Sequence, residues 1–423
     1  MKERITVLLG AGAMIEATGV STKSLTEKVI SKCKKYKINQ ESEKSVVDVI
    51  CDKFLSVYNK EISAESEAST IEKITSIISF EDIFHVLELL PNYKKNKYGY
   101  KGHISAYTIF SELNNEFEKL DMKSVYLSAQ EIIDVINDEI FNYDCEFNKK
   151  GKDFKRFFDE ISSEGNYKFD VFNLNYDTWM EQTLKDYNDG FIKIPEGNGK
   201  MQRFDINEYL KEDDRHTISH LHGQICFEYP DFKVDEVNRY VYKESHNTLY
   251  KYNNYNDAKD YRLRSAHSGD STQSGENLFR TNIVTGLMKT DKLLWNPLNA
   301  YHNRFMNALL KNKRLILIGY GFSDLYINSL LYQYNAKHFE DRKMVMIDYV
   351  SDDDWQPTIE HPFYPSDKAI FTNLMHKSDH WYEKYMFKDK KNIIISEDNM
   401  VCICTSGFNS ALNYIEKIKN FLK

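Results

Sequence analysis

Two side chains that could act on a bound substrate stand at the ends of strand-like runs of the sequence. Asn175 lies near the end of the run Phe169–Asp177, and His222 near the end of the run Ile218–Gly223. An imidazole, with an ordinary pKa of about 6.5, suits proton transfer near neutral pH, and a carboxamide suits holding a hydroxyl group or a water. Alternatives stay open, because Asn175 could equally begin a turn or a helix, and His222 could be a buried structural histidine with His220 as its local competitor.

Glycine-rich turns follow two other strand-like runs. Gly10-Ala11-Gly12-Ala13 comes after Ile5–Leu9, and Gly319-Tyr320-Gly321-Phe322-Ser323-Asp324 comes after Leu315–Ile318. Small residues between a strand and a helix allow backbone amides to approach a phosphate group, whose charge the helix dipole favours. The first turn lacks the third glycine of G-x-G-x-x-G, where Ile15 stands, so it could also be an ordinary tight turn. Together the two turns favour a dinucleotide site at the switch point of a parallel sheet.

A carboxylate, Asp348, follows the strand-like run Met344–Ile347. An acidic side chain at such a place often accepts a hydrogen bond from a ribose hydroxyl, although Asp348 could also cap a helix or a turn. No metal site is predicted. The six cysteines form no C-x-x-C pair, which disfavours a zinc ribbon or a disulfide framework, and the acidic run 352–354 is typical of a solvated loop.

The order of strand-like and helix-like segments predicts an α/β protein built on a Rossmann-like parallel sheet. Residues 1–40 and 166–350 are the predicted core, and Thr281–Val284 is expected to be one of its strands. Residues 41–165 are predicted to be a large helical insertion, since apolar residues recur there at helical spacing. Residues 351–423 are expected to be a small C-terminal extension packed on the core.

Local signals indicate where three helices of the first half begin, end or bury a face. Ser24–Glu27 has the form of a capping box, so the first long helix is expected to begin there. Pro91 is expected to end a second helix. An apolar stripe marks one face of a third helix and predicts that this face is buried; it consists of Ile132, Ile133, Ile136 and Ile140.

The composition is that of an ordered globular protein. Hydrophobic residues make up 41% and charged residues 28% of 423, which excludes global disorder. The net charge of −8 gives no overall electrostatic footprint for duplex nucleic acid. The apolar stretches are shorter than a membrane-spanning helix needs, and the N-terminus leads directly into a strand-like run rather than a signal sequence. We therefore expect a cytoplasmic protein that contacts no membrane.

Five motifs, taken in order, resemble those of the sirtuin-like proteins, in particular of their bacterial antiphage-defence branch. They are Gly10–Ala13, Asn173–Asp177, Leu221–Gly223, Val284–Gly286 and Gly319–Asp324. The resemblance implies a Rossmann-like fold that binds NAD, with Asn175 and His222 in the catalytic positions. The residues expected to bind NAD are Gly10, Ala11, Gly12, Ala13, Asp177, Thr285, Gly286, Gly319, Gly321, Ser323 and Asp348.

Two departures from this resemblance bear on the reaction. Sirtuin deacylases carry paired zinc-binding cysteines and usually a serine after the first glycine motif, whereas this chain has no such pair and has Met14 there. Hydrolysis of NAD+ to nicotinamide and ADP-ribose by a defence effector, without a metal, is therefore the favoured function. A protein deacylase and a non-catalytic sensor of NAD or ADP-ribose are the alternatives. The resemblance also implies a separately encoded partner such as a HerA-type motor ATPase. The homo-oligomer is expected for another reason: the apolar stripes of residues 41–165 exceed what a cover over one sheet needs, so this part is predicted to self-associate and partly to cover the NAD pocket, with a bundle inside one chain as the alternative.

Overall fold

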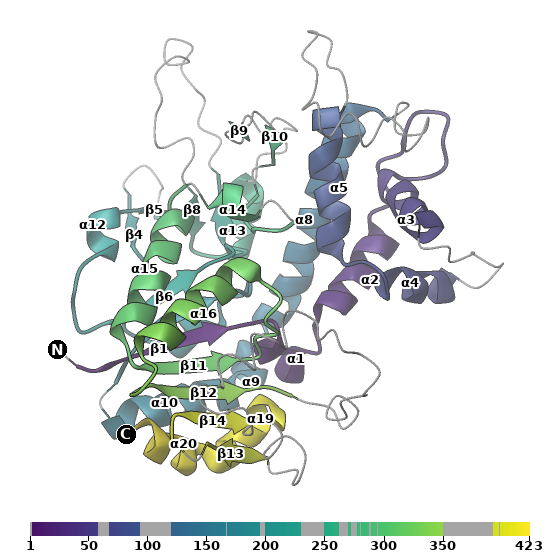
Figure 1. The fold of residues 1–423 in the computed structure, drawn as a ribbon. Helices are drawn as coiled ribbons and strands as arrows, with labels where there is room; N and C mark the ends of the chain where they lie inside the picture. Colours follow the sequence, from purple (N-terminus) through teal and green to yellow (C-terminus); the bar gives the residue numbers. More distant parts are fainter. Residues whose placement is uncertain are drawn as a thin grey trace.

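The centre of the fold is a sheet of eight strands in the order β13-β14-β12-β11-β1-β2-β6-β3 (Figure 1). Seven strands run parallel, and β13 (Ile393–Ile395) is antiparallel to β14. The other strands are β1 (Arg4–Leu9), β2 (Lys168–Asn173), β3 (Tyr187–Asn188), β6 (His216–His220), β11 (Arg314–Ile318), β12 (Lys343–Ile347) and β14 (Val401–Cys404). The predicted α/β, Rossmann-like fold class is thereby confirmed.

The structure is a computed structural model that describes most of the chain. The described residues are 2–57, 67–93, 120–165, 167–194, 199–229, 249–261, 270–271, 277–279, 281–286, 289–293, 295–349, 392–396 and 398–423. Parts of all three predicted segments lie outside them: residues 58–66 and 94–119 of the helical insertion, 351–391 and 397 of the C-terminal extension, and several stretches of the core, of which 230–248 is the longest.

Both faces of the sheet are buried, because successive side chains of a strand point to opposite sides. In β1 the fully buried Ile5 and Val7 belong to one apolar core and the fully buried Leu8 to another. Helices cover the two faces (Figure 1). One face carries α15 (Leu298–Lys311) and α16 (Leu325–Lys337), and the other carries α1 (Gly12–Thr18), α10 (Lys152–Gly165), α19 (Gly407–Ala411) and α20 (Ile415–Leu422).

The chain order reverses between β1 and β11, two neighbours at the middle of the sheet. From β1 the chain continues to β2 and β6 on one side, and it then returns to β11 and β12 on the other. In sheets of this kind, ligands bind at the carboxyl ends of the strands where the order reverses. Gly10 directly follows β1 and Gly319 directly follows β11, so both glycine turns lie at this switch point.

Helices make up the described chain between β1 and β2. After α1 come α2 (Thr22–Lys32), α3 (Val46–Val57), α4 (Glu67–Thr75), α5 (Phe80–Tyr93), α8 (Met122–Asp144), α9 (Phe147–Lys150) and α10. The predicted apolar stripe is one buried face of α8: Ile132, Ile133, Ile136 and Ile140 are at most 3% exposed. Figure 1 shows α2, α3, α5 and α8 beyond the end of the sheet toward which β1 points.

Three local predictions are wrong. The capping box is formed by Ser21 and Ser24, so α2 begins at Thr22, one turn earlier than predicted. Pro91 lies inside α5, which continues to Tyr93. Residues 281–284 form no strand of the sheet; they contribute one antiparallel bridge, between Ile283 and Gly223. An apolar run of this length packs against a loop as readily as into a sheet, and spacing alone does not distinguish the two.

A second, smaller sheet lies beside the main one. It has the order β4-β5-β8-β7, with β4 (Phe191–Lys193), β5 (Met201–Phe204), β7 (Phe227–Glu228) and β8 (Tyr250–Tyr252). At the other edge, β14 extends the main sheet by pairing in parallel with β12. None of the helices in the described part of the chain is long and apolar enough to cross a membrane.

Candidate active site

Asn175 and His222 leave the sheet at the same level. Asn173 of β2 is in register with His220 of β6, and the Leu221 amide donates to the Asn173 carbonyl over 2.9 Å. Each candidate lies two residues beyond this last pair of its strand. The topology therefore brings both side chains to the carboxyl edge of the sheet, with Asn175 next to β1 and its glycine turn and His222 one strand further away.

Asn175 is 8% exposed and is held by hydrogen bonds on both sides. Its backbone amide donates to Asn173 Oδ1 over 2.9 Å, and its own Nδ2 donates to the Gly10 carbonyl over 3.0 Å. The side chain of Asn173 thus stabilises the turn after β2, and the side chain of Asn175 connects that turn to the glycine turn after β1. Among the described residues none donates to Asn175 Oδ1, which leaves this oxygen as a hydrogen-bond acceptor for a ligand.

His222 faces a carboxylate that the sequence prediction did not place in the site. Its Nε2 lies 3.4 Å from Asp324 Oδ2, and both side chains are largely buried, at 9% and 15% exposed. Asp324 Oδ1 accepts hydrogen bonds from the amides of Tyr326 and Ile327, so the same residue caps α16. Burial raises the pKa of Asp324, but the hydrogen bond and charge of His222, the Ile327 amide and the charge of Lys289 together hold this pKa well below its ordinary value.

The loop that carries His222 is pinned by its backbone. The Val284 amide donates to the His222 carbonyl over 2.7 Å. Gly223 has a φ of 78°, and a Cβ atom there would lie 2.1 Å from the Asn282 carbonyl oxygen. The position therefore requires glycine, both for its conformation and for the close approach of Asn282. The Asn282 side chain in turn hydrogen-bonds to Asn137 of α8.

His220 does not compete with His222 for the same site. Its Nε2 contacts Glu181 Oε1 of α11 (Trp179–Thr183) at 3.0 Å, and it is fully buried. Lys251 of β8 and Gln224 also donate to this carboxylate oxygen. His220 was the local competitor because residues two apart on a strand share a face, but β6 ends at His220, and the alternation of side chains ends with it.

The two glycine turns pack directly on one another. A Cβ atom on Gly10 would lie 2.4 Å from the Gly319 carbonyl oxygen, and one on Gly319, where φ is 58°, would lie 2.0 Å from the Ala13 amide. The amides of Gly10, Gly12 and Ala13 donate to the carbonyls of Ile318, Gly319 and Gly10. These glycines are therefore needed for contact between the turns, and their amides are already engaged within the protein.

Gly321 and Ser323 differ from the glycines at this contact. A Cβ atom on Gly321 would meet no atom within 4 Å, and Ser323 is exposed. Phe322, between them, has a φ of 57°, a conformation that costs a non-glycine residue free energy. Its carbonyl accepts a hydrogen bond from Asn328 Nδ2 over 2.7 Å, which helps to hold the strained turn. The open side of the second turn is the part that a ligand can approach.

Thr285 and Gly286 lie against the helical insertion. Lys292 Nζ, in α14 (Lys289–Lys292), donates to the Thr285 carbonyl over 2.7 Å and forms an ion pair of 2.6 Å with Glu88 of α5. The two charged side chains are 7% and 0% exposed. Gly286 has a φ of 80°, and a Cβ atom there would lie 2.6 Å from Glu88 Oε2. A buried ion pair thus joins α5 to the segment that pins His222.

Two carboxylates of the predicted site have different surroundings. Asp177 is fully buried and accepts from the Trp179 amide and the Tyr143 hydroxyl, so its oxygens position the start of α11 and contact α8. Asp348 is partly exposed at the end of β12 and accepts from the Tyr349 amide. Burial, followed by the charge of Glu16, raises the pKa of Asp348 to about 6. Of the two, Asp348 has the placement suited to a ribose hydroxyl.

Comparison with protein-family models gives a match. Residues 170–361 match the family model of the SIR2-like domain. The match supports a sirtuin-like family. It spans Asn175, His222, the second glycine turn and Asp348, whereas the first glycine turn lies before it. SIR2-like domains are commonly NAD-utilising enzymes, so the match supports NAD-related activity in general. No curated protein matches the chain.

Sequence reasoning missed the roles of Asp324, Glu88 and Lys292. Asp324 ends the second glycine turn and was recognised only as a helix cap, because a single residue type at a helix start does not indicate which distant side chain it faces. Glu88 and Lys292 lie in segments with no motif. Metal sites were not expected, and no cluster of three potential metal ligands occurs in the part of the chain that the structure describes.

Proposed function

We propose that the protein is an NAD+ glycohydrolase that converts NAD+ to nicotinamide and ADP-ribose. The observation that carries the proposal is the placement of Asn175 and His222 at the switch point, with Asp324 beside the imidazole. The SIR2-like match supports NAD as the substrate. The missing cysteine pairs favour hydrolysis over protein deacylation.

The leaving group of this reaction needs no protonation. Nicotinamide departs as a neutral molecule from a cationic pyridinium, so no general acid is needed at that nitrogen. The protein must stabilise an oxocarbenium-like ribose and supply a water, and both tasks depend on positioned hydrogen bonds and dipoles. Asn175 supports this assignment, because its Nδ2 is fixed by Gly10 and its Oδ1 remains available to a ribose hydroxyl or a water.

His222 is the proposed proton acceptor. In the tautomer that donates Nε2–H to Asp324, Nδ1 carries the lone pair that takes a proton from a ribose hydroxyl or the attacking water. The Asp324 carboxylate fixes the ring and stabilises the imidazolium that forms. Asp324 is a positioning residue in this proposal, since it acts through His222.

The other site residues divide between binding and architecture. We assign Gly321 and Ser323 to the open face that receives NAD and Asp348 to a ribose hydroxyl. Gly10, Gly12, Ala13 and Gly319 shape the switch point by their mutual contact, and Ala11 lies exposed beside them. Asp177, Thr285 and Gly286 hold the surrounding loops.

The proposed biological role is antiphage defence by depletion of cellular NAD in the cytoplasm. We propose that the chain self-associates and responds to a defence-system partner such as a HerA-type motor ATPase. The helices α5 and α8 support regulation of this kind, because they contact the segment that pins His222 through Lys292, Asn282 and their partners. Sedimentation at micromolar concentration with and without the partner tests the assembly, and a strict monomer with full activity contradicts it.

A substitution with a matched control tests the catalytic assignment. His222→Ala is expected to abolish nicotinamide release from NAD+. His338→Ala removes another buried histidine, at the opposite end of α16, whose Nε2 contacts the Leu309 carbonyl and whose Nδ1 lies 3.9 Å from Asp341 Oδ1. This control is expected to retain turnover. Addition of an acyl-lysine peptide separates the alternatives, since a deacylase requires the peptide for nicotinamide release and a hydrolase does not.

A further inference from the structure

A cavity lies at the end of the sheet opposite to the candidate active site. Its volume is about 850 Å³, within the range of small-molecule sites. Arg4 at the start of β1, Asp170 near the start of β2 and Arg314 at the start of β11 line it, together with one side of α15. Because the strands are parallel, this amino edge is separated from the carboxyl edge by their full length. None of its lining residues belongs to the proposed NAD site.

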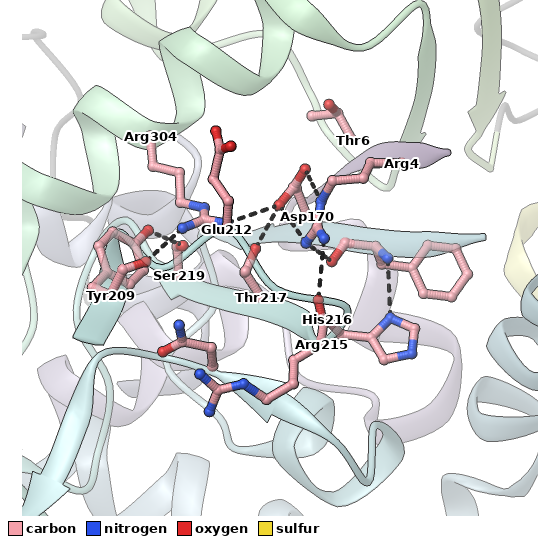
Figure 2. A network of polar contacts seen from close by, with 12 residues as sticks. Arg4, Thr6, Asp170, Tyr209, Glu212, Arg215, His216, Thr217, Ser219 and Arg304 are labelled. Atoms are coloured by element: carbon pink, nitrogen blue, oxygen red, sulfur yellow. Dashed lines mark hydrogen bonds and ion pairs between the residues drawn. The ribbon is translucent and has the colours of Figure 1, made fainter. Parts of the chain in front are cut away.

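The floor of the cavity is a rigid charged network, which Figure 2 shows around Asp170. Arg4 binds both carboxylate oxygens of Asp170 over 2.9 Å, and Thr217 donates to one of them over 2.7 Å. Asn312 donates to the other over 3.0 Å. Arg304 approaches the same carboxylate to 3.5 Å from α15. The network fixes the side chains at the base of the cavity before any ligand arrives.

Arg304 has donors left for a ligand. A guanidinium carries five N–H groups. Those of Arg304 contact the Tyr209 carbonyl over 2.6 Å and Asp170, and no further acceptor among the described residues. The side chain is 18% exposed at the cavity. A planar guanidinium that is held in place with unused donors is suited to a phosphate group.

The walls combine amides with apolar surface. Asn299, Asn303 and Asn307 follow one another at four-residue spacing, so they form one exposed row along α15. Asn303 Nδ2 donates to Asn299 Oδ1 over 2.9 Å, and the remaining groups of the row present both donors and acceptors. Two large lining residues are apolar instead. Ile206 and Leu210 are 39% and 59% exposed. An exposed aliphatic surface suits the face of a flat ring.

The charge of the lining is positive in a chain whose net charge is −8. Six cationic side chains, Lys2, Arg4, Arg304, Lys311, Lys313 and Arg314, line the cavity with four carboxylates, Glu3, Asp170, Glu212 and Asp213. Several of the cations are in ion pairs: Arg4 with Asp170, Arg314 with Glu3, Lys311 with Glu212, and Lys313 with Asp341 outside the lining. A local excess of positive charge in an acidic protein favours an anionic ligand. We therefore expect a ligand that has a phosphate group, polar edges and a flat ring. The phosphate matches the excess charge and the fixed guanidinium, the polar edges match the amide row, and the ring matches the apolar wall.

We propose that this cavity is a second binding site that takes a nucleoside monophosphate. The phosphate binds Arg304 and the lysines that line the cavity. The polar edges of the sugar and the base bind the amide row of α15, and the flat face of the base packs on Ile206 and Leu210. The site needs no NAD turnover, so the proposal stands apart from the glycohydrolase activity.

Equilibrium dialysis of the full chain with 5′-AMP tests the proposal, with adenosine as the matched ligand without phosphate. We expect 5′-AMP to bind and adenosine to bind at least about tenfold more weakly. Exposed positions on α15 allow a charge test that leaves the fold intact. Asn303→Asp is expected to weaken 5′-AMP binding about tenfold or more, and Asn303→Lys to leave it as tight or tighter. Asn413→Asp, an exposed position outside the cavity, is the control and leaves binding unchanged.

Two results overturn the proposal. One is the absence of 5′-AMP binding to cooperatively folded protein. The other is 5′-AMP binding that is equal in Asn303→Asp, Asn303→Lys and the unaltered chain, because such binding lies elsewhere, for instance in the NAD site. The readout is affinity rather than product formation, so a failure here leaves the hydrolase proposal intact and the reverse also holds.

Discussion

His222 Nε2 and Asp324 Oδ2 lie 3.4 Å apart, and this contact joins the loop after β6 to the turn after β11. The two oxygens of Asp324 have separate partners, since Oδ1 caps α16 and Oδ2 faces the imidazole. The orientation of the proposed proton acceptor is therefore tied to the start of a helix. Asp324 therefore both caps α16 and orients His222.

Replacement of Asp324 by asparagine separates these two tasks. Asparagine caps helices as well as aspartate does, so Asp324→Asn is expected to keep stability within about 0.5 kcal/mol. It removes the charge that stabilises the imidazolium, and kcat for NAD+ hydrolysis should fall about a hundredfold with little change in KM. Steady-state kinetics and thermal melting measure the two effects.

Alanine at the same position provides the comparison. Asp324→Ala should lose the activity and also about 1 kcal/mol of stability, because the cap is lost as well. A kcat of Asp324→Asn equal to that of the unaltered chain would show that the carboxylate serves only the helix.

The buried ion pair between Lys292 and Glu88 should matter more to stability than its exposed neighbour. Lys292→Met leaves the Glu88 carboxylate buried without its cation, which is expected to cost about 3–5 kcal/mol in urea unfolding. Lys289 and Glu81 join the same two helices, but both are 25% exposed, so Lys289→Met should cost about 1 kcal/mol or less. An equal loss of unfolding free energy in Lys292→Met and Lys289→Met would show that burial of the ion pair does not determine its contribution to stability.

The double variant Lys292→Met with Glu88→Leu removes both charges together. It should recover most of the lost stability, since no unpaired charge remains buried. A further loss on adding Glu88→Leu would mean that the carboxylate has another essential partner. The same variants report on the site, because Lys292 holds the carbonyl of Thr285, next to the residue that pins His222.

The two glycine turns should respond differently to a side chain. Gly10→Ala places a Cβ atom 2.4 Å from a carbonyl oxygen and is expected to destabilise the fold. Gly321→Val faces open space, so it should fold normally and raise KM for NAD by occupying the proposed ligand space. Calorimetric titration with NAD tests this difference. Unchanged affinity in Gly321→Val removes the second turn from the binding site.

Asp348 should discriminate NAD from NADP in a pH-dependent way. Its pKa of about 6, raised by burial and then by Glu16, makes the carboxyl charged well above that pH and neutral well below it. The charged form repels a 2′-phosphate, so NADP should be excluded most strongly at about pH 8 and least at about pH 5.

A pair of variants tests this discrimination through kcat/KM for the two dinucleotides. Asp348→Asn should reduce the preference for NAD about tenfold at about pH 8 and change it little at about pH 5. Asp341→Asn, which alters an exposed aspartate paired with Lys313, should leave the preference unchanged. A preference that does not vary with pH in the unaltered chain contradicts the placement of Asp348 at the ribose.

The sequence allowed prediction of the sheet and of the strand ends, because buried parallel strands are continuous apolar runs that end in polar or glycine residues. β1, β11 and β12 have this form, whereas β2 contains Asp170 and β6 has Ile218 as its one apolar residue. The run Thr281–Val284 looks the same but packs on a loop, since periodicity cannot identify the partner of a short apolar segment.

The candidate site was predictable in its motifs but not in its contacts. Asn175 and His222 follow from strand ends and from the resemblance, whereas the approach of Asp324 to His222 depends on how two distant loops meet. The glycines of the first turn were expected to approach a phosphate, yet their amides donate to neighbouring carbonyls. Glycine is needed wherever another group approaches the backbone closely. The sequence does not indicate whether that group belongs to a ligand or to another part of the chain.

The most direct test of the central claim is product analysis of NAD+ incubated with the purified chain, together with its activating partner where one is required, in the presence of a chelator. We predict nicotinamide and ADP-ribose in equal amounts without any acyl-peptide, and neither product from Asn175→Ala or His222→Ala proteins that melt as the unaltered chain does. Undiminished turnover in either variant, or release of nicotinamide only when an acyl-lysine peptide is added, would contradict the assignment of Asn175 and His222 as the catalytic residues of a hydrolase.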